Sequence, residues 1–309
     1  MISCTEFIPA YSTLFTYLEE KFGPAEVPKY WGLHFDPTKS PLYRYVSTEG
    51  IRGCFSYWTG TLNEEAADFT MYVNEKRGYY LLDMHHCPSK GRLLKLKDEI
   101  GVEPYHGYCL HCDHYRAAIE ACGLRYIFNC VGADKASCSI LIYDPNIFDG
   151  RLIVDEDTEI MDRSASDNEY FHRAFHGSLN KGIAYLEKTY GEADVDAYLV
   201  KFANDFYWPI AKKAKEIGLA AIEEKILDTY KNEHALDAVR TELSEDALTV
   251  TVTYCPAEKY LRSVEVEVTE MFYKSTEVVM RTLAENSGFG FSFDYYDPTT
   301  GAAKYRFTK

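Results

Sequence analysis

The chain repeats itself at an offset of 168 residues. Residues 17–31 match residues 185–199 at seven of fifteen positions, where about one identity is expected by chance. The same register continues without a gap and aligns six further pairs: Gly50 with Gly218, Thr61 with Thr229, Glu65 with Glu233, Ala67 with Ala235, Cys87 with Cys255, and Leu93 with Leu261. A repeat of this length predicts two copies of one folding unit.

The two copies also end alike, at an offset of 165 residues. Gly123 and Gly288 each introduce a short run that is followed by a turn, at residues 132–135 and 297–301, and by a second run. Gly, Asp and Pro supply the turn dihedrals, so each copy is expected to end in a β-hairpin. The predicted domains are a first copy at 1–145, an acidic linker at 146–168 with a short strand at 151–154, and a second copy at 169–309.

Hydrophobic periodicity orders the elements within each copy. In the second copy, helices are expected at 171–190, from Glu192 onward with a kink or restart at Pro209, at 219–230 and up to Asn286. Alternation marks a half-buried strand whose core face carries Leu248, Val250, Val252 and Tyr254. The first copy is similar, with a loop expected at 36–45. The expected fold class is α+β: an internally duplicated unit of helices followed by an antiparallel sheet with a terminal β-hairpin, arranged as a pseudo-dimer.

Composition narrows the class of protein. The 309 residues suit about two domains, and no apolar run approaches the roughly 18 residues of a membrane span. The net charge of −15 would repel phosphate groups, so neither nucleic acid nor a membrane is an expected partner. Nine cysteines, an odd number without a secretory signal at residues 1–15, indicate free thiols in the cytoplasm.

Polar features found in only one copy are the candidates for function. Eight cysteines and six histidines lie before residue 145, against one cysteine and three histidines after it. The Cys-Pro pairs at Cys87 and Cys255 occur in both copies and suit a buried thiol at a strand end. The first copy is therefore the candidate active unit, and the second is expected to be degenerate.

Two clusters of the first copy carry most of this difference. In the first cluster, alignment with the second copy places Tyr80, Leu82, Met84 and His86 toward the core, so Asp83, His85 and Cys87 are expected on the other face. In the second cluster, residues 108–114, Asp113 is expected to cap a helix running to Cys122, where the positive helix end would stabilise a thiolate. The candidate catalytic residues are Cys87, Cys112, His111 and Asp113, and the candidate substrate-binding residues are His85, His86, Cys109, His114 and Tyr108.

Several chemistries fit these residues. Cys87 or Cys112 could act as a nucleophile with a neighbouring histidine as base. Cys109, Cys112 and His111 could instead hold a divalent metal such as zinc or manganese, or the two thiols could form a redox pair. Buried thiols without chemistry are the remaining interpretation. In the second copy, His172 and His176 stand at i and i+4, a spacing that suits a metal but is more typical of an exposed helix edge.

Residues 69–144 resemble the L-2-amino-thiazoline-4-carboxylic acid hydrolase-like family. The similar features are the strand ending in Cys87 and Pro88, the cluster at 109–113 opening a helix, and the closing hairpin at 132–138. The resemblance implies a cytoplasmic hydrolase that opens a small cyclic amidine or thiazoline acid by attack on the carbon between sulfur and nitrogen. Cys87 or Cys112 would supply the nucleophile, His111 the proton transfer and Asp113 the orientation.

Two other classes of function stay open at this point. One is a small-molecule or metal-binding protein of the sensor type without catalysis, with a pocket lined by some of the many aromatic side chains. The other is a structural protein. The expected partner is a small-molecule substrate, with a homodimer left open.

Overall fold

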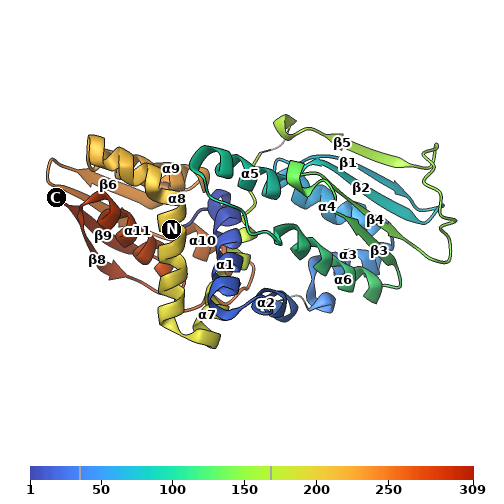
Figure 1. Cartoon of the computed structure of the whole chain (residues 1–309), viewed down its shortest axis with the longest axis horizontal. Coiled ribbons are helices and arrows are strands. Elements are labelled where there is room, and N and C mark those ends of the chain that lie inside the picture. The colour runs from blue at the N-terminus through green and yellow to red at the C-terminus, as the bar shows by residue number, and fades with distance from the viewer. Residues whose placement is uncertain (35, 168) are drawn as a thin grey trace. The chain divides into compact units, whose positions relative to one another are not determined.

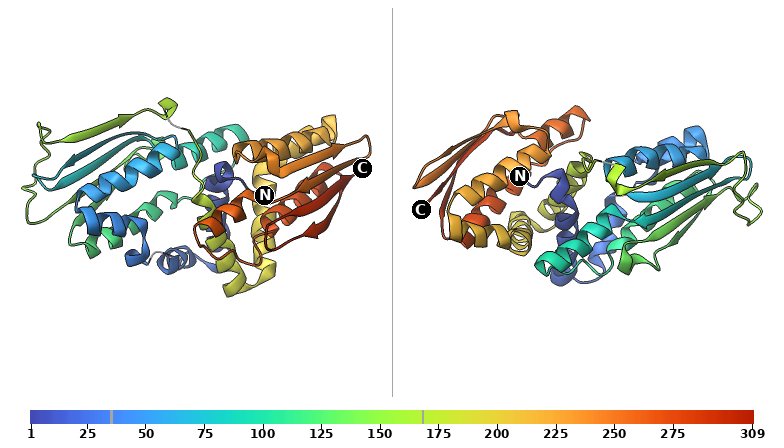
Figure 2. Two further views of the ribbon diagram at one scale, coloured as in Figure 1. Left: turned by 180° about the vertical axis from the view of Figure 1, so that it is seen from behind. Right: turned by 90° about the horizontal axis from the view of Figure 1, so that it is seen from above.

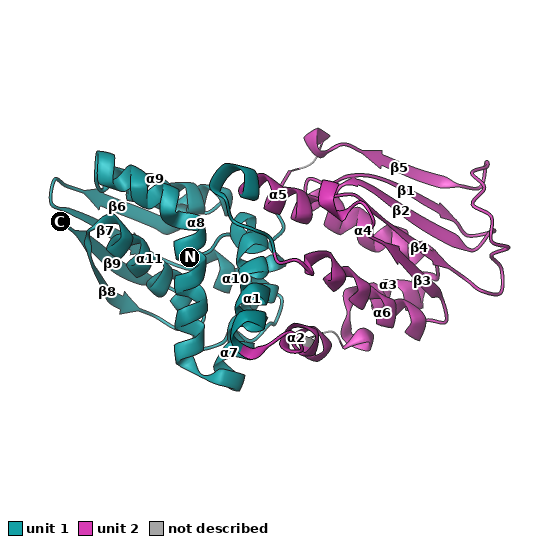
Figure 3. Cartoon of the chain, viewed as in Figure 1, with its two compact units in different colours: residues 1–21, 97–104, 171–309 teal, residues 22–96, 105–170 magenta. Residues whose placement is uncertain are grey.

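The computed structural model describes residues 1–34, 36–167 and 169–309. The chain divides into two compact units, shown in Figure 3. Unit 1 consists of residues 1–21, 97–104 and 171–309, and unit 2 consists of residues 22–96 and 105–170. Each unit packs helices against one antiparallel sheet, so the predicted α+β class is confirmed.

Unit 2 contains a five-stranded sheet with the strand order β3-β4-β2-β1-β5 (Figure 1), in which all neighbours are antiparallel. Its strands are β1 (Asp68–Asn74), β2 (Tyr79–His86), β3 (Arg125–Asn129), β4 (Cys138–Tyr143) and β5 (Glu159–Arg163). Its helices are α2 (Glu26–His34), α3 (Pro41–Glu49), α4 (Arg52–Glu64), α5 (Pro88–Ile100, whose last turn belongs to unit 1) and α6 (Tyr115–Ala121).

The core of unit 2 lies between the helices and one face of this sheet (Figure 2). Alternation along β2 buries Tyr80, Leu82 and Met84 and leaves Asp83 and His85 exposed, as the sequence pattern predicts. The core position expected for His86 is wrong, because this last residue of the strand is exposed. In α4 the ring of Trp58 stacks on that of Tyr80, with centroids 5.4 Å apart. This aromatic pair joins the helix to the sheet beside the strand that leads to Cys87.

Unit 1 contains a four-stranded antiparallel sheet with the order β6-β7-β9-β8. Its strands are β6 (Val239–Leu243), β7 (Ala247–Val252), β8 (Gly290–Tyr296) and β9 (Ala303–Thr308). Its helices are α1 (Phe7–Phe22), α7 (Phe175–Tyr190), α8 (Glu192–Ile217), α9 (Ala220–Asn232), α10 (Pro256–Ser263) and α11 (Lys274–Ser287). The expected strand is β7, with Leu248, Val250 and Val252 buried, and both predicted hairpins, β3-β4 and β8-β9, are confirmed. Helix α8 continues past Pro209, so this proline does not restart it.

The two sheets share one strand order. The order β8-β9-β7-β6 in unit 1 corresponds strand by strand to β3-β4-β2-β1 in unit 2. Helices α1 and α7 occupy ranges that differ by the repeat offset of 168. Helices α4 and α9 both end at a glutamate C-cap, Glu65 and Glu233, followed by a left-handed residue, Ala66 (φ 54°) and His234 (φ 53°). These are the correspondences that the repeat predicts, while the duplication and the pseudo-dimeric arrangement stay predictions.

The compact units do not follow the predicted domain boundaries. Helix α1, expected within a domain at 1–145, packs with residues 171–309. The Tyr198 hydroxyl donates to the Ala10 carbonyl at 2.9 Å, and the Tyr17 hydroxyl donates to Asp194 at 2.7 Å. Tertiary contacts, rather than the order along the chain, therefore assign this helix to its unit.

The segment 146–168 is part of unit 2 rather than a linker, apart from residue 168, which lies outside the described residues. The strand expected at 151–154 is found instead at β5, which covers the edge of β1 in antiparallel register. Asp155 accepts hydrogen bonds from Asn74 and from Arg77 in the turn after β1. At least one acidic side chain of this segment, that of Asp155, thus forms hydrogen bonds with the turn that follows β1.

The loop expected at 36–45 is also wrong, because α3 begins at Pro41. Proline suits the first position of a helix, where no amide donor is required, and the Ser40 hydroxyl caps the turn by accepting from the Tyr43 amide at 3.0 Å.

All nine cysteines are free thiols. No helix in the described part of the chain combines the length and apolar content of a membrane span.

Candidate functional site

Unit 2 brings four cysteines together. Cys87 follows β2, Cys109 and Cys112 lie on a 3₁₀ helix at Tyr108–His114, and Cys138 begins β4 opposite Met84. Burial raises the pKa of Cys112 well above its usual range, and the charges of Cys87, Cys138 and Cys109 raise it further. We call these four residues, which are all half-buried, the thiol cluster.

Cys87 turns toward the core and not toward the exposed face of β2. It packs against the hydrophobic core of unit 2, and its sulfur accepts a hydrogen bond from the Lys90 amide at 3.5 Å. Burial raises the pKa of its thiol to about 12. The expectation that Cys87 shares a face with His85 is therefore wrong, because the strand ends at His86 and the alternation ends with it.

His111 and Cys112 form a base and thiol pair. His111 Nδ1 lies 2.5 Å from the Tyr108 carbonyl oxygen, and because a carbonyl can only accept, this contact assigns the ring proton to Nδ1. Nε2 is then the accepting nitrogen, and it lies 3.6 Å from Cys112 Sγ. Burial lowers the pKa of His111 to about 4, so the imidazole is neutral near pH 7.

Asp113 does not have its expected role. The segment Tyr108–His114 is itself a 3₁₀ helix, and α6 begins only at Tyr115, so Asp113 is not its N-cap. The Asp113 carboxylate instead accepts a bidentate hydrogen bond from Arg116, with one contact at 2.6 Å. The orienting group for His111 is the Tyr108 carbonyl. The expectation of a thiolate stabilised by a helix end is also wrong, because burial raises the pKa of Cys112 and this effect is larger than that of the helix field.

The other expected binding residues lie in separate surroundings. His85 is exposed, 3.2 Å from the Thr70 hydroxyl and 3.5 Å from Asp68. The ring of His86 lies against Gly91, where a Cβ would collide with it. His114 packs on Trp31 with ring centroids 5.2 Å apart. Of the predicted residues, the structure thus gathers Cys87, Cys109, Cys112, His111 and Tyr108.

Glu65 is a functional candidate that we did not select from the sequence. It caps the end of α4, and its charge acts on Cys87, Cys112 and Tyr115. Burial raises the pKa of Glu65 to about 8, so the carboxyl carries a proton near neutral pH. The available signal was its alignment with Glu233, which marks a carboxylate at the same place in both copies.

We expect the stability penalty from Glu65 to develop as the pH rises from about 4.5 to about 8. Its folded pKa of about 8 lies above the ordinary value of 4.5, so its favourable contribution is complete below pH 4.5 and is lost as the pH rises through 8. The free energy of unfolding of Glu65→Gln relative to that of the wild type should therefore increase between pH 5 and pH 9, by at least about 1 kcal/mol. Urea denaturation at several pH values measures this. Glu156→Gln, at an exposed position of the same unit, is the control, and a pH-independent difference for Glu65→Gln would contradict the assignment.

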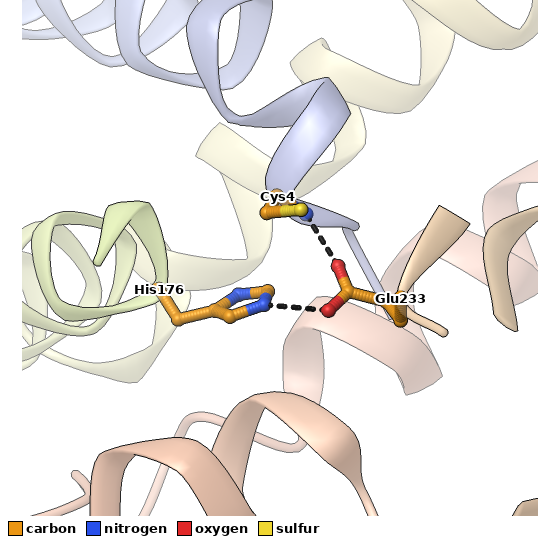
Figure 4. A group of neighbouring side chains, drawn as sticks. All are labelled: Cys4, His176 and Glu233. Atoms are coloured by element: carbon orange, nitrogen blue, oxygen red, sulfur yellow. Dashed lines mark hydrogen bonds and ion pairs between the residues drawn. The ribbon is translucent and has the colours of Figure 1, made fainter. Parts of the chain in front are cut away.

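Unit 1 contains a separate buried cluster, shown in Figure 4, which we call the Cys-His-Glu cluster. Cys4 lies on a short 3₁₀ helix at Cys4–Glu6, His176 lies in the first turn of α7, and Glu233 caps α9. One Glu233 oxygen accepts from the Cys4 amide at 2.5 Å, and the other lies 3.0 Å from His176 Nε2. The possible ligand atoms of all three side chains lie within 4.8 Å of one another.

This cluster differs from the two metal alternatives that the sequence left open, and the exposed helix edge expected for His172 and His176 is wrong because both side chains are buried. Helix α7 begins at Phe175, so His172 precedes it and is not one helical turn from His176. The His172 ring packs edge-on against Phe175, with centroids 4.4 Å apart. Among the residues that the structure describes, Cys109, Cys112 and His111 do not meet as a three-ligand group, whereas the Cys-His-Glu cluster does.

Comparison with protein families, curated proteins and solved structures finds no match for the chain. The function is therefore argued from the geometry of the two clusters.

Proposed function

We propose that this protein is a thiol-dependent hydrolase that opens a small cyclic amidine or thiazoline acid. The observation that carries the proposal is the row formed by Cys112 Sγ, His111 Nε2 and, behind Nδ1, the Tyr108 carbonyl. Nucleophile, base and orienting group are the three parts of a nucleophilic site. The resemblance of residues 69–144 to the thiazoline hydrolase-like family supports the substrate class.

Burial lowers the pKa of His111 to about 4 and raises the pKa of Cys112, so the proton moves from sulfur to imidazole only as the sulfur bonds to the substrate. The neutral imidazole of His111 accepts the Cys112 proton while the sulfur bonds to the substrate carbon between sulfur and nitrogen. Glu65, protonated near neutral pH, donates its proton to the ring nitrogen that takes up the electron pair. The ring carbon–sulfur bond then breaks, and the ring sulfur leaves as a thiol with the proton held by His111. Water attacks the same carbon and gives one proton to His111, and the bond from that carbon to Cys112 Sγ breaks. The product leaves as an open-chain urea with a free thiol, Cys112 recovers its proton from His111, and Glu65 recovers its proton from the added hydroxyl group.

Cys87 is the other candidate nucleophile. Its sulfur accepts an amide hydrogen bond from Lys90, and burial raises the pKa of both thiols, so acidity does not favour either one. Cys112 is preferred because a base lies 3.6 Å from its sulfur. The tyrosines Tyr57 and Tyr115, hydrogen-bonded to each other beside Cys112 and Glu65, supply further polar groups for a substrate.

The proposal is tested by turnover of L-2-amino-thiazoline-4-carboxylate, with acid quenching and mass spectrometry of the intact chain and its peptides. We expect a gain of one water per substrate and a transient adduct on the peptide that contains Cys112. An adduct on Cys87 would overturn the choice of nucleophile. Absence of turnover by the wild-type protein would contradict the substrate class.

A further inference from the structure

We propose that Cys4, His176 and Glu233 bind a divalent transition-metal ion, with zinc as the best fit to the donor set. The three side chains come from three separate segments, and their exposed fractions are 0%, 1% and 4%. Their possible ligand atoms already lie within 4.8 Å of one another. This site is distinct from the thiol cluster and goes beyond the proposed hydrolase activity, because all its residues belong to unit 1.

The charges of the cluster favour a doubly positive ion. Zinc is typically bound by cysteine sulfur, histidine nitrogen and carboxylate oxygen. A Cys4 thiolate and the Glu233 carboxylate carry two negative charges, and a neutral His176 adds none, so the occupied site has no net charge. A site without net charge avoids most of the cost of burying an ion. On binding, the Cys4 thiol proton leaves for solvent and a metal–sulfur bond takes its place.

The geometry already brings the histidine and carboxylate ligand atoms close together, and the Cys4 sulfur lies within 4.8 Å of them and has to move in by up to about 1 Å. Metal–ligand bonds of about 2.0–2.3 Å in a tetrahedral site place neighbouring ligand atoms roughly 3.3–3.7 Å apart. The observed 3.0 Å between His176 Nε2 and Glu233 Oε2 therefore has to widen by only a few tenths of an ångström. The Cys4 amide, which donates to the other carboxylate oxygen, holds Glu233 in the required orientation.

The repeat helps to distinguish this site from a feature of the shared fold. Glu233 has a counterpart in Glu65, but at the position equivalent to His176 the first copy has Ile8. The repeat therefore keeps the glutamate in both copies and has the histidine at this aligned position only in the second copy. The bound metal would tie Cys4 to Glu233, 229 residues further along the chain, and would hold the N-terminal segment on α7 and α9.

The first test uses full-length protein stripped of metal with a chelator and titrated with Co²⁺. We expect one ion per chain and a thiolate-to-cobalt charge-transfer band in the near ultraviolet. Cys4→Ser should lose this band, and Glu233→Gln should weaken Co²⁺ binding at least tenfold. Cys54→Ser, which changes an equally buried thiol in unit 2, is the matched control and should keep the band. A band that survives Cys4→Ser but disappears in Cys112→Ser would place the metal in the thiol cluster and overturn the proposal.

A second measurement needs no variant and stays decisive if the variants do not fold. X-ray absorption of the zinc-loaded wild-type protein should show one sulfur and lighter nitrogen or oxygen ligands. Zinc should also raise the melting temperature of the wild-type protein and slow amide exchange near Cys4. A first shell made mainly of sulfur, or no zinc uptake at all, would overturn the assignment. Neither result depends on hydrolase activity, so the two proposals fail separately.

Discussion

Replacing Cys112 with serine is expected to lower the turnover of L-2-amino-thiazoline-4-carboxylate by at least about 10³-fold. A serine hydroxyl has nearly the same size but is a much weaker nucleophile next to a neutral imidazole. The loss should appear in kcat, with little change in KM, because the thiol acts on the reacting carbon and not on the remote part of the substrate. Steady-state kinetics with the purified full-length protein measures both constants.

Cys122→Ser is the matched control, because Cys122 is also a half-buried thiol of unit 2, with its sulfur 3.9 Å from the Tyr43 carbonyl. Its turnover should stay close to wild type. His111→Gln should lower kcat by about 10²–10⁴-fold, the usual range for loss of a general base. Equal turnover by wild type and Cys112→Ser would remove the proposed mechanism, whatever the effect of His111→Gln.

Replacing His176 with leucine is expected to destabilise the metal-free protein by about 3–5 kcal/mol. Glu233 is buried, and burial alone would raise the pKa of its carboxyl. The hydrogen bond and charge of His176 and the amide of Cys4 nevertheless keep this pKa below its ordinary value. Without His176 the carboxylate loses its main partner. Urea denaturation in the presence of a chelator measures the effect without a contribution from bound metal.

The double variant His176→Leu with Glu233→Gln is the control for this second result. It removes the buried charge together with its partner, so its loss of stability should be smaller than the sum of the two single losses. A coupling energy near zero would show that His176 and Glu233 do not interact in solution. In that case the Cys-His-Glu cluster would also lose its support as a metal site.

Much of the fold follows from local patterns. The repeat at an offset of 168 leads to α1 and α7 at the same offset, and alternation at Leu248, Val250 and Val252 leads to β7. Glycine, proline and aspartate at the turns lead to the two closing hairpins. Such patterns depend on neighbours within a few residues, so they can be read without knowing how the chain packs.

The candidate site is only partly visible in the same way. Cys109, His111 and Cys112 are close in sequence, and the structure keeps them close to Cys87. The role expected for Asp113 was wrong because Arg116, one turn further on, takes its carboxylate. The carbonyl that orients His111 belongs to a backbone, and no side-chain pattern reveals a backbone acceptor.

Local order along the chain thus establishes the α+β class, the paired hairpins and the uneven distribution of thiols. Tertiary packing decides the remainder. It assigns α1 to unit 1, adds β5 to the sheet of unit 2, and brings Glu65 to the thiol cluster. It also joins Cys4 to His176 and Glu233. The physical reason is that burial and electrostatic contact depend on distance in space, and residues 229 positions apart share no local pattern that records it.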